Sequence, residues 1–528
     1  MKTILTLLLF SIAITANAQQ SVTNECDILI TNGKIIDGTG NNWYYGNVAI
    51  KDGKIIKIGK DISLSAKKII DATGLIVSPG FIDLHAHIES IHETPDAESH
   101  VRQGVTLALG GPDGGGPWPF GKYLDDLNKK PLGLNAAFLT GHNTIRKNIM
   151  NLDNRAPTAD ELEQMKKQVA QAMEEGAFGF STGLKYLPGT FSKVDEVIAL
   201  SKVASSYGGF YTSHLREEGL GLIEAVREAI LIGREAKIPI VLTHHKVVGK
   251  PSWGASIKTL AMVDSANKAG LDIQIDQYPY TASYTSISIL IPSWALAGGN
   301  KKYKERIADP ILRDSIKKEI VYNIMTDRGA GDISRIQFSK VEWKKELEGK
   351  TLADWSRMRK LEPTPENGAE LVIEAESNGG SGMIFHAMDA ADVERIMKHP
   401  KTMIASDGRL SQPGNGHPHP RAYGTFPRVL GYYVREKKLL TLEEAIHKMT
   451  QLPALRMGFK DRGVIDQNNY ADLVIFNPAT IKDKSTFEEP HQYPEGILYV
   501  IVNGEITVDN GIFTTTRAGK VLFGPGKK

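Results

Sequence analysis

The chain has 528 residues, of which 41% are hydrophobic and 23% are charged, a composition typical of a globular protein long enough for more than one domain. Its 63 Lys and Arg residues nearly balance its 61 Asp and Glu residues, which leaves a formal net charge of +2. Such a balance creates no long-range field that attracts phosphates or anionic lipids, so we expect neither a nucleic-acid-binding protein nor a membrane-surface protein.

The first residues have the pattern of an export signal. Lys2 supplies a positive charge, a mostly apolar stretch follows over residues 4–14, and residues 16–18 (Ala-Asn-Ala) have the small side chains of a cleavage site. A buried helix or a membrane anchor is the alternative, but the apolar stretch is short for crossing a bilayer. We therefore predict a signal peptide over residues 1–18 and an exported protein, either periplasmic or secreted.

Cys26 is the only cysteine of the chain. An exported protein with one cysteine has no internal disulfide, so its stability must come from a large hydrophobic core. Because Cys26 lies close to the mature N-terminus, we expect any metal site to use histidine and carboxylate side chains instead.

Short apolar stretches separated by Asn-Gly and Asp-Gly turns predict β-hairpins at both ends of the chain. Near the start the turns lie at residues 32–33 and 52–53, and near the end a similar turn at 503–504 follows apolar stretches at 471–476 and 500–502. Because chain termini commonly lie close together, we predict one small β-sandwich domain built from residues 25–78 and 457–520.

Between these ends, residues 79–456 alternate between strand and helix patterns. The predicted strands include 105–109, 177–180, 209–212, 238–243, 271–275 and 402–405, and the predicted helices include 157–175, 222–236 and 257–269. Repeated β–α alternation favours a parallel sheet, and this many units predicts an α/β fold with a TIM-type (β/α)8 barrel. Residues 285–380 carry a charged helical stretch and no clear strand, and we interpret them as an insertion over the barrel mouth.

Side chains that bind metals follow several of the predicted strands. His85 and His87 come after an apolar stretch, and their spacing of two places both imidazoles on one face. His214, His244 and Asp407 follow three further strands. One such histidine is usually structural, but reactive groups of TIM barrels lie at the carboxyl ends of strands, so together these residues predict a metal site.

The stretch 78–87 (Ser-Pro-Gly-Phe-Ile-Asp-Leu-His-Ala-His) resembles the opening metal motif of the amidohydrolase superfamily. Further segments resemble its D-aminoacylase branch, the N-acyl-D-amino-acid deacylases, in order along nearly the whole mature chain; they are 179–184, 243–246, 276–280, 406–408, 417–428 and 471–476. The resemblance implies that one or two Zn²⁺ ions, or another divalent metal, are bound by a set of five residues: His85, His87, His214, His244 and Asp407.

The sequence departs from this family at one turn. In the D-aminoacylases that this sequence resembles, the corresponding turn is Gly-Asn-Cys-Gly, and its cysteine is a metal ligand. Here Asp113 stands at the position of that cysteine. A carboxylate can bridge two metals, so we favour Asp113 as a ligand, although an Asp before Gly is also common in ordinary turns. A carboxylated Lys185 is an alternative bridge, but Lys185 lies past the strand end, where a substrate contact or a solvent-facing side chain is expected.

The resemblance also implies a deacylase of N-acyl-amino acids with a small-molecule substrate, in which a metal activates water and Asp407 acts as general acid and base. The implied substrate-binding residues are Lys246, Arg421 and Tyr186, with Tyr280 and Lys185 as weaker candidates. An exported metallo-dipeptidase or carboxypeptidase on the same scaffold is the main alternative, and a non-catalytic binding protein is a remote one. Stereochemistry, acyl preference, metal number and oligomeric state stay open.

Overall fold

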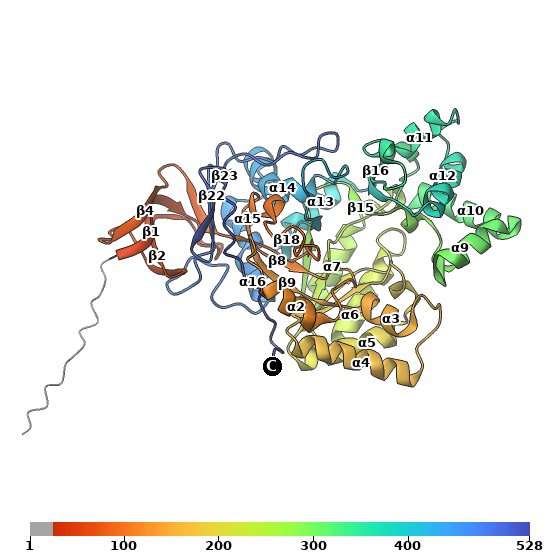
Figure 1. Ribbon diagram of the computed structural model, residues 1–528, viewed down its shortest axis with the longest axis horizontal. Helices are drawn as coiled ribbons and strands as arrows, with labels where there is room; N and C mark the ends of the chain where they lie inside the picture. Colours follow the sequence, from red (N-terminus) through yellow and green to blue (C-terminus); the bar gives the residue numbers. More distant parts are fainter. Residues whose placement is uncertain (1–24) are drawn as a thin grey trace, which may run out of the picture.

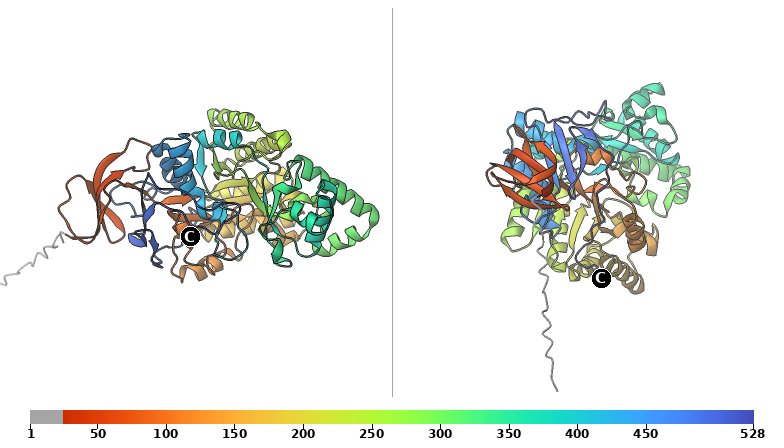
Figure 2. Two further views of the ribbon diagram at one scale, coloured as in Figure 1. Left: turned by 90° about the horizontal axis from the view of Figure 1, so that it is seen from above. Right: turned by 60° about the vertical axis from the view of Figure 1, so that its left-hand side comes forward.

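The structure, a computed structural model, describes residues 25–528 (Figure 1). The predicted signal peptide at residues 1–18 lies outside the described residues. Along the long axis of the molecule, a β-rich part is followed by an α/β body and then by a group of helices that projects from the body (Figures 1 and 2). Within the described range, none of the helices has both the length and the apolar character needed to cross a membrane.

The β-rich part is a nine-stranded sheet that joins the two ends of the chain. The N-terminal end supplies β1 (Glu25–Ile35), β2 (Tyr44–Lys51), β3 (Lys54–Gly59), β4 (Ser65–Asp71) and β5 (Ile76–Pro79). The C-terminal end supplies β20 (Leu473–Phe476), β21 (Ile497–Val502), β22 (Glu505–Asp509) and β23 (Ile512–Phe513). Antiparallel pairing of β5 with β20 joins the two sets, and their alternating apolar side chains share one core.

The α/β body contains parallel strands in two hydrogen-bonded sets. The first set is β6 (Phe81–Asp83), β8 (Val105–Gly110) and β9 (Asn135–Phe138). The second set is β10 (Thr140–Gly141), β11 (Gly179–Gly183), β12 (Phe210–His214), β13 (Ile240–Leu242), β14 (Ile273–Gln277) and β18 (Thr402–Ile404). The predicted α/β class with parallel strands is confirmed.

Backbone contacts connect these two sets at both sides. Only Leu139 separates β9 from β10, and the Phe178 amide donates a hydrogen bond of 2.9 Å to the Phe138 carbonyl. On the other side, β19 (Gly408–Arg409) follows β18 and pairs in parallel with β7 (Ala86–His87), which follows β6. The carboxyl ends of the first and last parallel strands therefore lie side by side.

Helices pack on these strands, as α5 does on β11 and β12 and α6 on β13. In α6, Leu222, Val226, Ala229 and Ala236 recur at helical spacing and are buried. The helices of the body are α1 (Glu98–Val101), α2 (Phe120–Asn128), α3 (His142–Met150), α4 (Ala159–Glu174), α5 (Val194–Ser206), α6 (Leu222–Ala236), α7 (Ser256–Lys268), α13 (Ala390–Lys398), α14 (Arg421–Arg428), α15 (Leu442–Met449) and α16 (Gln451–Arg456).

Between β14 and β18 the chain leaves the body and forms a separate hydrophobic core. Its helices are α8 (Ser293–Leu296), α9 (Gly299–Ala308), α10 (Pro310–Thr326), α11 (Leu352–Met358) and α12 (Pro365–Ser377). It also contains a three-stranded antiparallel sheet of β15 (Ser283–Ser286), β16 (Ile336–Lys340) and β17 (Gly382–Phe385). The prediction of no strand within residues 285–380 was wrong for β16, because this five-residue strand is defined by pairing with β17, which follows two helices later.

Candidate metal centre

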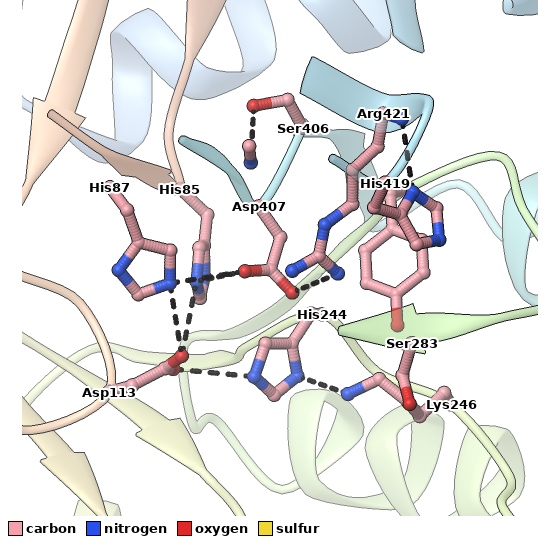
Figure 3. A network of polar contacts seen from close by, with 12 residues as sticks. His85, His87, Asp113, His244, Lys246, Ser283, Ser406, Asp407, His419 and Arg421 are labelled. Carbon is pink, nitrogen blue, oxygen red and sulfur yellow. Dashed lines mark hydrogen bonds and ion pairs between the residues drawn. The ribbon is translucent and has the colours of Figure 1, made fainter. Parts of the chain in front are cut away.

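The candidate ligands at the carboxyl ends of the parallel strands converge on one place (Figure 3). Their ligand atoms form two groups, in each of which all the atoms lie within 4.8 Å of one another. The first ligand group is His85, His87, Asp113 and Asp407, and the second ligand group is Asp113, His214 and His244. Asp113 belongs to both, so the structure brings together Asp113 and the five residues that the resemblance implied as ligands.

In the first ligand group, imidazole nitrogens face carboxylate oxygens. His87 Nε2 lies 3.2 Å from Asp407 Oδ1 and 3.6 Å from Asp113 Oδ2, and His85 Nε2 lies 3.5 Å from each of these oxygens. His85 Nε2 is buried and has no hydrogen-bond partner among the described residues. A buried polar atom without a partner is costly, and an ion at the centre of this group would satisfy it.

In the second ligand group, His214 Nδ1 lies 2.7 Å from His244 Nε2, which lies 3.3 Å from Asp113 Oδ1. Asp113 Oδ1 is buried and accepts no hydrogen bond within the described chain. Two nitrogens and one oxygen that converge in this way match the ligands that Zn²⁺ prefers. The residues present therefore fit a metal ion at both groups.

Three of the ligand residues have backbone conformations that are uncommon outside glycine. The φ angles are 55° for Asp113, 37° for His244 and 51° for Asp407. Asp407 N donates a hydrogen bond of 2.8 Å to His85 O, and His244 N donates one of 2.6 Å to Asp276 Oδ1, so the surrounding structure fixes these conformations. Sharp bends of this kind turn the side chains inward at the strand ends, and such strain is typical of functional sites.

The turn that carries Asp113 needs glycine at Gly111. Gly111 has a φ of 75°, and a Cβ there would lie 2.4 Å from the backbone oxygen of Leu139. The Gly111 amide donates a hydrogen bond of 2.7 Å to Glu89 Oε1, which holds the turn against the site. The close approach of this turn to the neighbouring strand is what places Asp113 between the two ligand groups.

The electrostatic environment keeps both carboxylates ionised. Burial raises the pKa of Asp113, but the nearby imidazoles of His85 and His244 lower it further, so the net direction is well below its usual value. Burial also raises the pKa of Asp407, and the Arg421 guanidinium, with Nη1 2.7 Å from Asp407 Oδ2, outweighs that effect. Burial lowers the pKa of His214 well below its usual value, which leaves a neutral imidazole able to bind a metal.

A buried ionic network lies behind the second ligand group. Glu218 Oε1 lies 2.5 Å from Lys246 Nζ and 3.3 Å from His244 Nδ1. Glu218 Oε2 lies 2.7 Å from Arg328 Nη2 and 3.5 Å from His214 Nε2. Sequence reasoning missed Glu218 and Arg328. Glu218 follows another glutamate, and nothing in the sequence distinguishes which of the two points inward, while Arg328 comes from the segment between β14 and β18.

Two cavities of about 800 Å³ and 480 Å³ open at the ligand groups and share several residues, including His87 and Asp407. Lys246 and Tyr186 line the larger cavity, and the Tyr186 ring lies 4.3 Å from the His214 ring. Arg421 lines the smaller cavity. Three of the residues predicted to contact substrate therefore lie beside the ligand groups.

The structure places the two weaker candidates elsewhere. Tyr280 lines neither cavity, and its hydroxyl donates to the Pro420 carbonyl at 3.5 Å, whereas Tyr278 lines the larger cavity. The two tyrosines are separated by one proline, and the sequence does not show which of them faces inward. Lys185 Nζ pairs with Glu217 at 2.7 Å and belongs to neither ligand group, so Asp113 rather than Lys185 joins the two groups.

Comparisons with known proteins agree with this geometry. The amidohydrolase family model matches residues 362–508. D-aminoacylase of Alcaligenes xylosoxydans xylosoxydans is 33% identical to the chain, over 95% of the chain and 99% of that protein. N-acyl-D-glutamate deacylase of the same organism is 36% identical, over 91% of the chain and 93% of that protein.

Solved structures are similar as well. N-acyl-D-glutamate deacylase from Bordetella bronchiseptica, in complex with zinc and a phosphonate that mimics the tetrahedral intermediate, has a TM-score of 0.82 and 34% identity over 94% of this chain and 100% of that chain. A D-aminoacylase described as having a binuclear metal centre has a TM-score of 0.80 and 34% identity over the same shares.

Proposed function

The chain belongs to the amidohydrolase family, in the branch of the D-aminoacylases, and we propose that it removes the acyl group from N-acyl-D-amino acids by metal-dependent hydrolysis. The observation that carries this proposal is the pair of ligand groups joined by Asp113, with Asp407 at the meeting point of two cavities. The reaction breaks a C–N amide bond that is not a peptide bond and releases a carboxylic acid and an amino acid.

Zinc fits the ligand groups, because they offer imidazole nitrogens and carboxylate oxygens and no thiolate. His85, His87 and Asp407 would hold one ion, His214 and His244 another, with Asp113 shared between them. When bound, zinc lowers the pKa of a water molecule towards neutrality and polarises a carbonyl group.

Asp407 is the proton carrier of the proposed reaction. Its Oδ1 faces His87 Nε2 at 3.2 Å, and its Oδ2 is paired with Arg421, so the carboxylate is ionised and oriented. An ionised carboxylate in this place accepts a proton from the attacking water and donates it to the leaving amine in the same turnover. A single carboxylate can perform both proton transfers, because donating the proton to the amine returns it to its ionised starting state.

Cationic side chains beside the ligand groups suit the carboxylate of an amino acid product. Lys246 Nζ lies in the wall of the larger cavity, 2.6 Å from His244 Nδ1, and Arg421 reaches the smaller cavity (Figure 3). Arginine donates two parallel hydrogen bonds to a carboxylate, and lysine supplies a compact charge. We assign to these two residues the binding of the substrate carboxylate, with Tyr186 on the wall of the larger cavity.

The finer architecture is part of the proposal. We infer that the parallel strands within residues 79–456 form a closed (β/α)8 barrel, since β19 pairs with β7 and the Phe178 amide joins β9 to β11. The small β domain comprises residues 25–78 and 457–520, and the segment at about 285–380 is an insertion whose Arg328 and Trp343 line the larger cavity.

We also propose that the protein is exported to the periplasm or secreted. The support is the positive, apolar and small-residue pattern of residues 1–18. N-terminal sequencing of the protein from a host with a secretion pathway tests this proposal, and a mature chain that begins after residue 18 is expected. A chain that keeps Met1 and stays in the cytoplasm would contradict it.

The activity is tested with a panel of N-acetyl-D-amino acids, N-acetyl-L-amino acids and dipeptides, offered to zinc-loaded and chelator-treated protein. We expect zinc-dependent release of acetate from the D series. Hydrolysis confined to the dipeptides would identify a metallopeptidase instead and would contradict the proposal.

A further inference from the structure

The second ligand group has a carboxylate behind it that takes no part in the reaction proposed above. We propose that Glu218 is a positioning residue that holds the imidazoles of His214 and His244 in the orientation that a zinc ion requires. This inference rests on the proposed metal-dependent function. It assigns a role to a residue that binds neither substrate nor metal.

Each of the two imidazoles has one nitrogen towards the ligand group and one towards Glu218. His214 Nδ1 and His244 Nε2 converge with Asp113 Oδ1. The opposite nitrogens, His214 Nε2 and His244 Nδ1, lie 3.5 Å and 3.3 Å from the two oxygens of the Glu218 carboxylate. One carboxylate thus faces both rings, with one oxygen for each ring.

This arrangement determines which nitrogen of each ring carries hydrogen. A histidine that binds a metal through one nitrogen carries its hydrogen on the other, and a carboxylate that accepts this hydrogen fixes the tautomer and the ring orientation. His214 Nε2 is buried without a hydrogen-bond partner in the described part of the chain, and Glu218 Oε2 is the acceptor within reach. Glu218 is therefore the group placed to accept the hydrogen of this nitrogen once the ring binds a metal through Nδ1.

The Glu218 carboxylate is itself held in place from the other side. Lys246 Nζ lies 2.5 Å from Oε1, and Arg328 Nη2 lies 2.7 Å from Oε2. Glu218, Lys246 and Arg328 are 3%, 2% and 1% exposed, so little water competes for these contacts. Lys246 Nζ also lies 2.6 Å from His244 Nδ1, closer than Glu218 Oε1 at 3.3 Å. A metal bound at Nε2 would leave the ring hydrogen on Nδ1, so His244 and Lys246 would then both be donors, with Glu218 Oε1 as the acceptor that they share.

Glu218 consequently connects the metal ligands to the cation that we assign to the substrate carboxylate. Removing its charge frees the two rings to rotate and leaves Lys246 without its acidic partner. The first effect weakens the binding of metal, and the second changes the binding of substrate. A carboxylate that served only to stabilise the fold would change neither of these once the protein was folded.

The test is the zinc affinity of Glu218→Gln, measured by competition with a coloured chelator in the absence of substrate. Glutamine keeps the size of the side chain but has only one acceptor oxygen, so it cannot accept from both rings. We expect zinc binding about 10- to 100-fold weaker than in the wild type, as for other partners of metal-bound histidines. Glu218→Asp keeps the charge, but its shorter side chain places the carboxylate farther from the rings. Its zinc affinity should lie between those of the wild type and Glu218→Gln.

Glu196→Gln is the matched control. Glu196 is also a buried glutamate with a histidine and an arginine as partners, His142 Nε2 at 2.8 Å and Arg146 Nη1 at 2.5 Å, but it is in neither ligand group. Loss of zinc affinity in the Glu218 variants with unchanged affinity in Glu196→Gln supports the inference. Wild-type affinity in both Glu218 variants, or an equal loss in Glu196→Gln, overturns it.

This experiment separates the inference from the proposed function, because zinc binding is measured without catalysis. If the wild type binds zinc but deacylates none of the panel, the proposed function fails while the role of Glu218 is still decided by its affinities. Should Glu218→Gln not fold, Glu218→Asp and the wild type give the comparison, and equal affinities of these two proteins contradict the inference.

A second inference rests on a different observation: among the described residues, the cavity-lining Arg409 has no acidic partner. Of the Lys and Arg side chains that line the two cavities, four are ion-paired: Lys246 and Arg328 with Glu218, Lys340 with Glu342, and Arg421 with Asp407. Arg409 lines both cavities and has no ion pair among the described residues; its guanidinium lies 5.6 Å from the centre of the Tyr284 ring.

The position of Arg409 is set by the backbone, because it pairs with His87 in the short sheet of β19 and β7. An unpaired guanidinium beside a metal-binding histidine is suited to bind an anion, most effectively a carboxylate. We infer that Arg409 binds a second carboxylate of the substrate, in addition to the one assigned to Lys246 and Arg421. This carboxylate belongs either to the amino-acid side chain or to the far end of the acyl group.

Pairs of substrates that differ only in this charge test the inference. N-acetyl-D-glutamate against N-acetyl-D-glutamine examines the side chain, and N-succinyl-D-leucine against its succinamoyl analogue examines the acyl group. We expect wild-type kcat/KM to favour the carboxylate in one pair by at least about tenfold, which is the scale of one hydrogen bond to a charged group. Arg409→Met should remove this preference, with the neutral substrates cleaved as before.

Lys340→Met is the control, since Lys340 lines both cavities but is already paired with Glu342. No preference in either pair, or an equal loss for charged and neutral substrates in Arg409→Met, contradicts the inference. Because the neutral substrates report deacylation independently, their cleavage by the wild type keeps a failure of this inference distinct from a failure of the proposed function.

Discussion

The two ligand groups share Asp113 but differ in how firmly their histidines are held. In the second ligand group, His214 and His244 are each 2% exposed and have the Glu218 network behind them. In the first ligand group, His85 is as buried, at 1% exposed, but the His87 side chain is 19% exposed and lines both cavities, whereas His214 and His244 line only the larger one. We infer from the exposure of His87 that the second ligand group holds its ion more firmly and that water and substrate reach the first.

The largest expected effect comes from the open group. Asp407→Asn keeps the size of the side chain and a contact for Arg421 but removes the proton acceptor. We expect turnover of N-acetyl-D-amino acids to fall by about 10²- to 10⁴-fold, the usual worth of a general acid–base group, with zinc retained in the second ligand group. Kinetics together with elemental analysis measure both quantities, and a near-wild-type rate would remove Asp407 from its assigned role.

Two histidine variants test most directly whether the two ligand groups differ in how firmly they bind zinc. His214→Ala takes a ligand from the second ligand group and should weaken zinc binding at that group by more than about 100-fold, because even a partner outside the ligand set is worth about 10- to 100-fold. His87→Ala should leave the ion of that group bound. Zinc titration of both variants gives the answer, and equal losses would mean that the groups do not differ.

The shared residue can be changed to sharpen the same comparison. Asp113→Cys puts a thiolate where the carboxylate stands, and we expect the second ligand group to keep its zinc, since zinc accepts sulfur and oxygen ligands alike. Asp113→Ala removes the ligand from both groups and should lower the zinc content more than Asp113→Cys. If alanine and cysteine at this position bind zinc equally, Asp113 is an ordinary turn residue.

The smallest expected effect lies in the body, away from the ligand groups, at Lys448. Its Nζ donates to the backbone carbonyls of His399 and Thr402 at 2.5 and 3.1 Å, and burial lowers the pKa of Lys448 from 10.5 to about 8. The unfolded chain therefore binds more protons than the folded one between pH 8 and 10.5, so this residue makes the fold more stable as the pH rises through that range.

Thermal unfolding of the wild type and Lys448→Met at several pH values tests this expectation. The stability of the wild type relative to the variant should increase from pH 8 to 10, while zinc affinity at neutral pH should be the same in both. A difference in stability that does not vary with pH would show that Lys448 has the same pKa in the folded and the unfolded chain.

Much of the site could be predicted from the sequence, because its ligands follow recognisable strands at short spacing. His85 and His87 are separated by one residue, and the bends at Asp113, His244 and Asp407 come directly after apolar stretches. What escaped prediction depends on contacts across the fold. Glu218 acquires its role from two rings on different strands, and Arg328 reaches it from the segment between β14 and β18.

Features of the fold that depend on contacts between distant segments also escaped prediction from the sequence. The predicted turns at 52–53 and 503–504 do connect paired strands, β2 with β3 and β21 with β22, and Asp52 and Asn503 have positive φ angles of 51° and 48°. The turn predicted at 32–33 was wrong, because Asn32 and Gly33 lie within β1, where its pairing with β2 shifts register. The strand β16 gave no comparable local signal. Likewise, the inward orientation of Tyr278 rather than Tyr280 is decided by packing, since Tyr280 lies against the His419 ring at 5.3 Å.

The location of zinc by anomalous X-ray scattering tests the central claim most directly. The account predicts an ion within about 2.0–2.2 Å of His214 Nδ1, His244 Nε2 and an oxygen of Asp113, the usual bond lengths for these ligands. A zinc ion bound elsewhere, or one coordinated by the histidines with the Asp113 carboxylate turned away, would contradict the claim that Asp113 joins the two ligand groups.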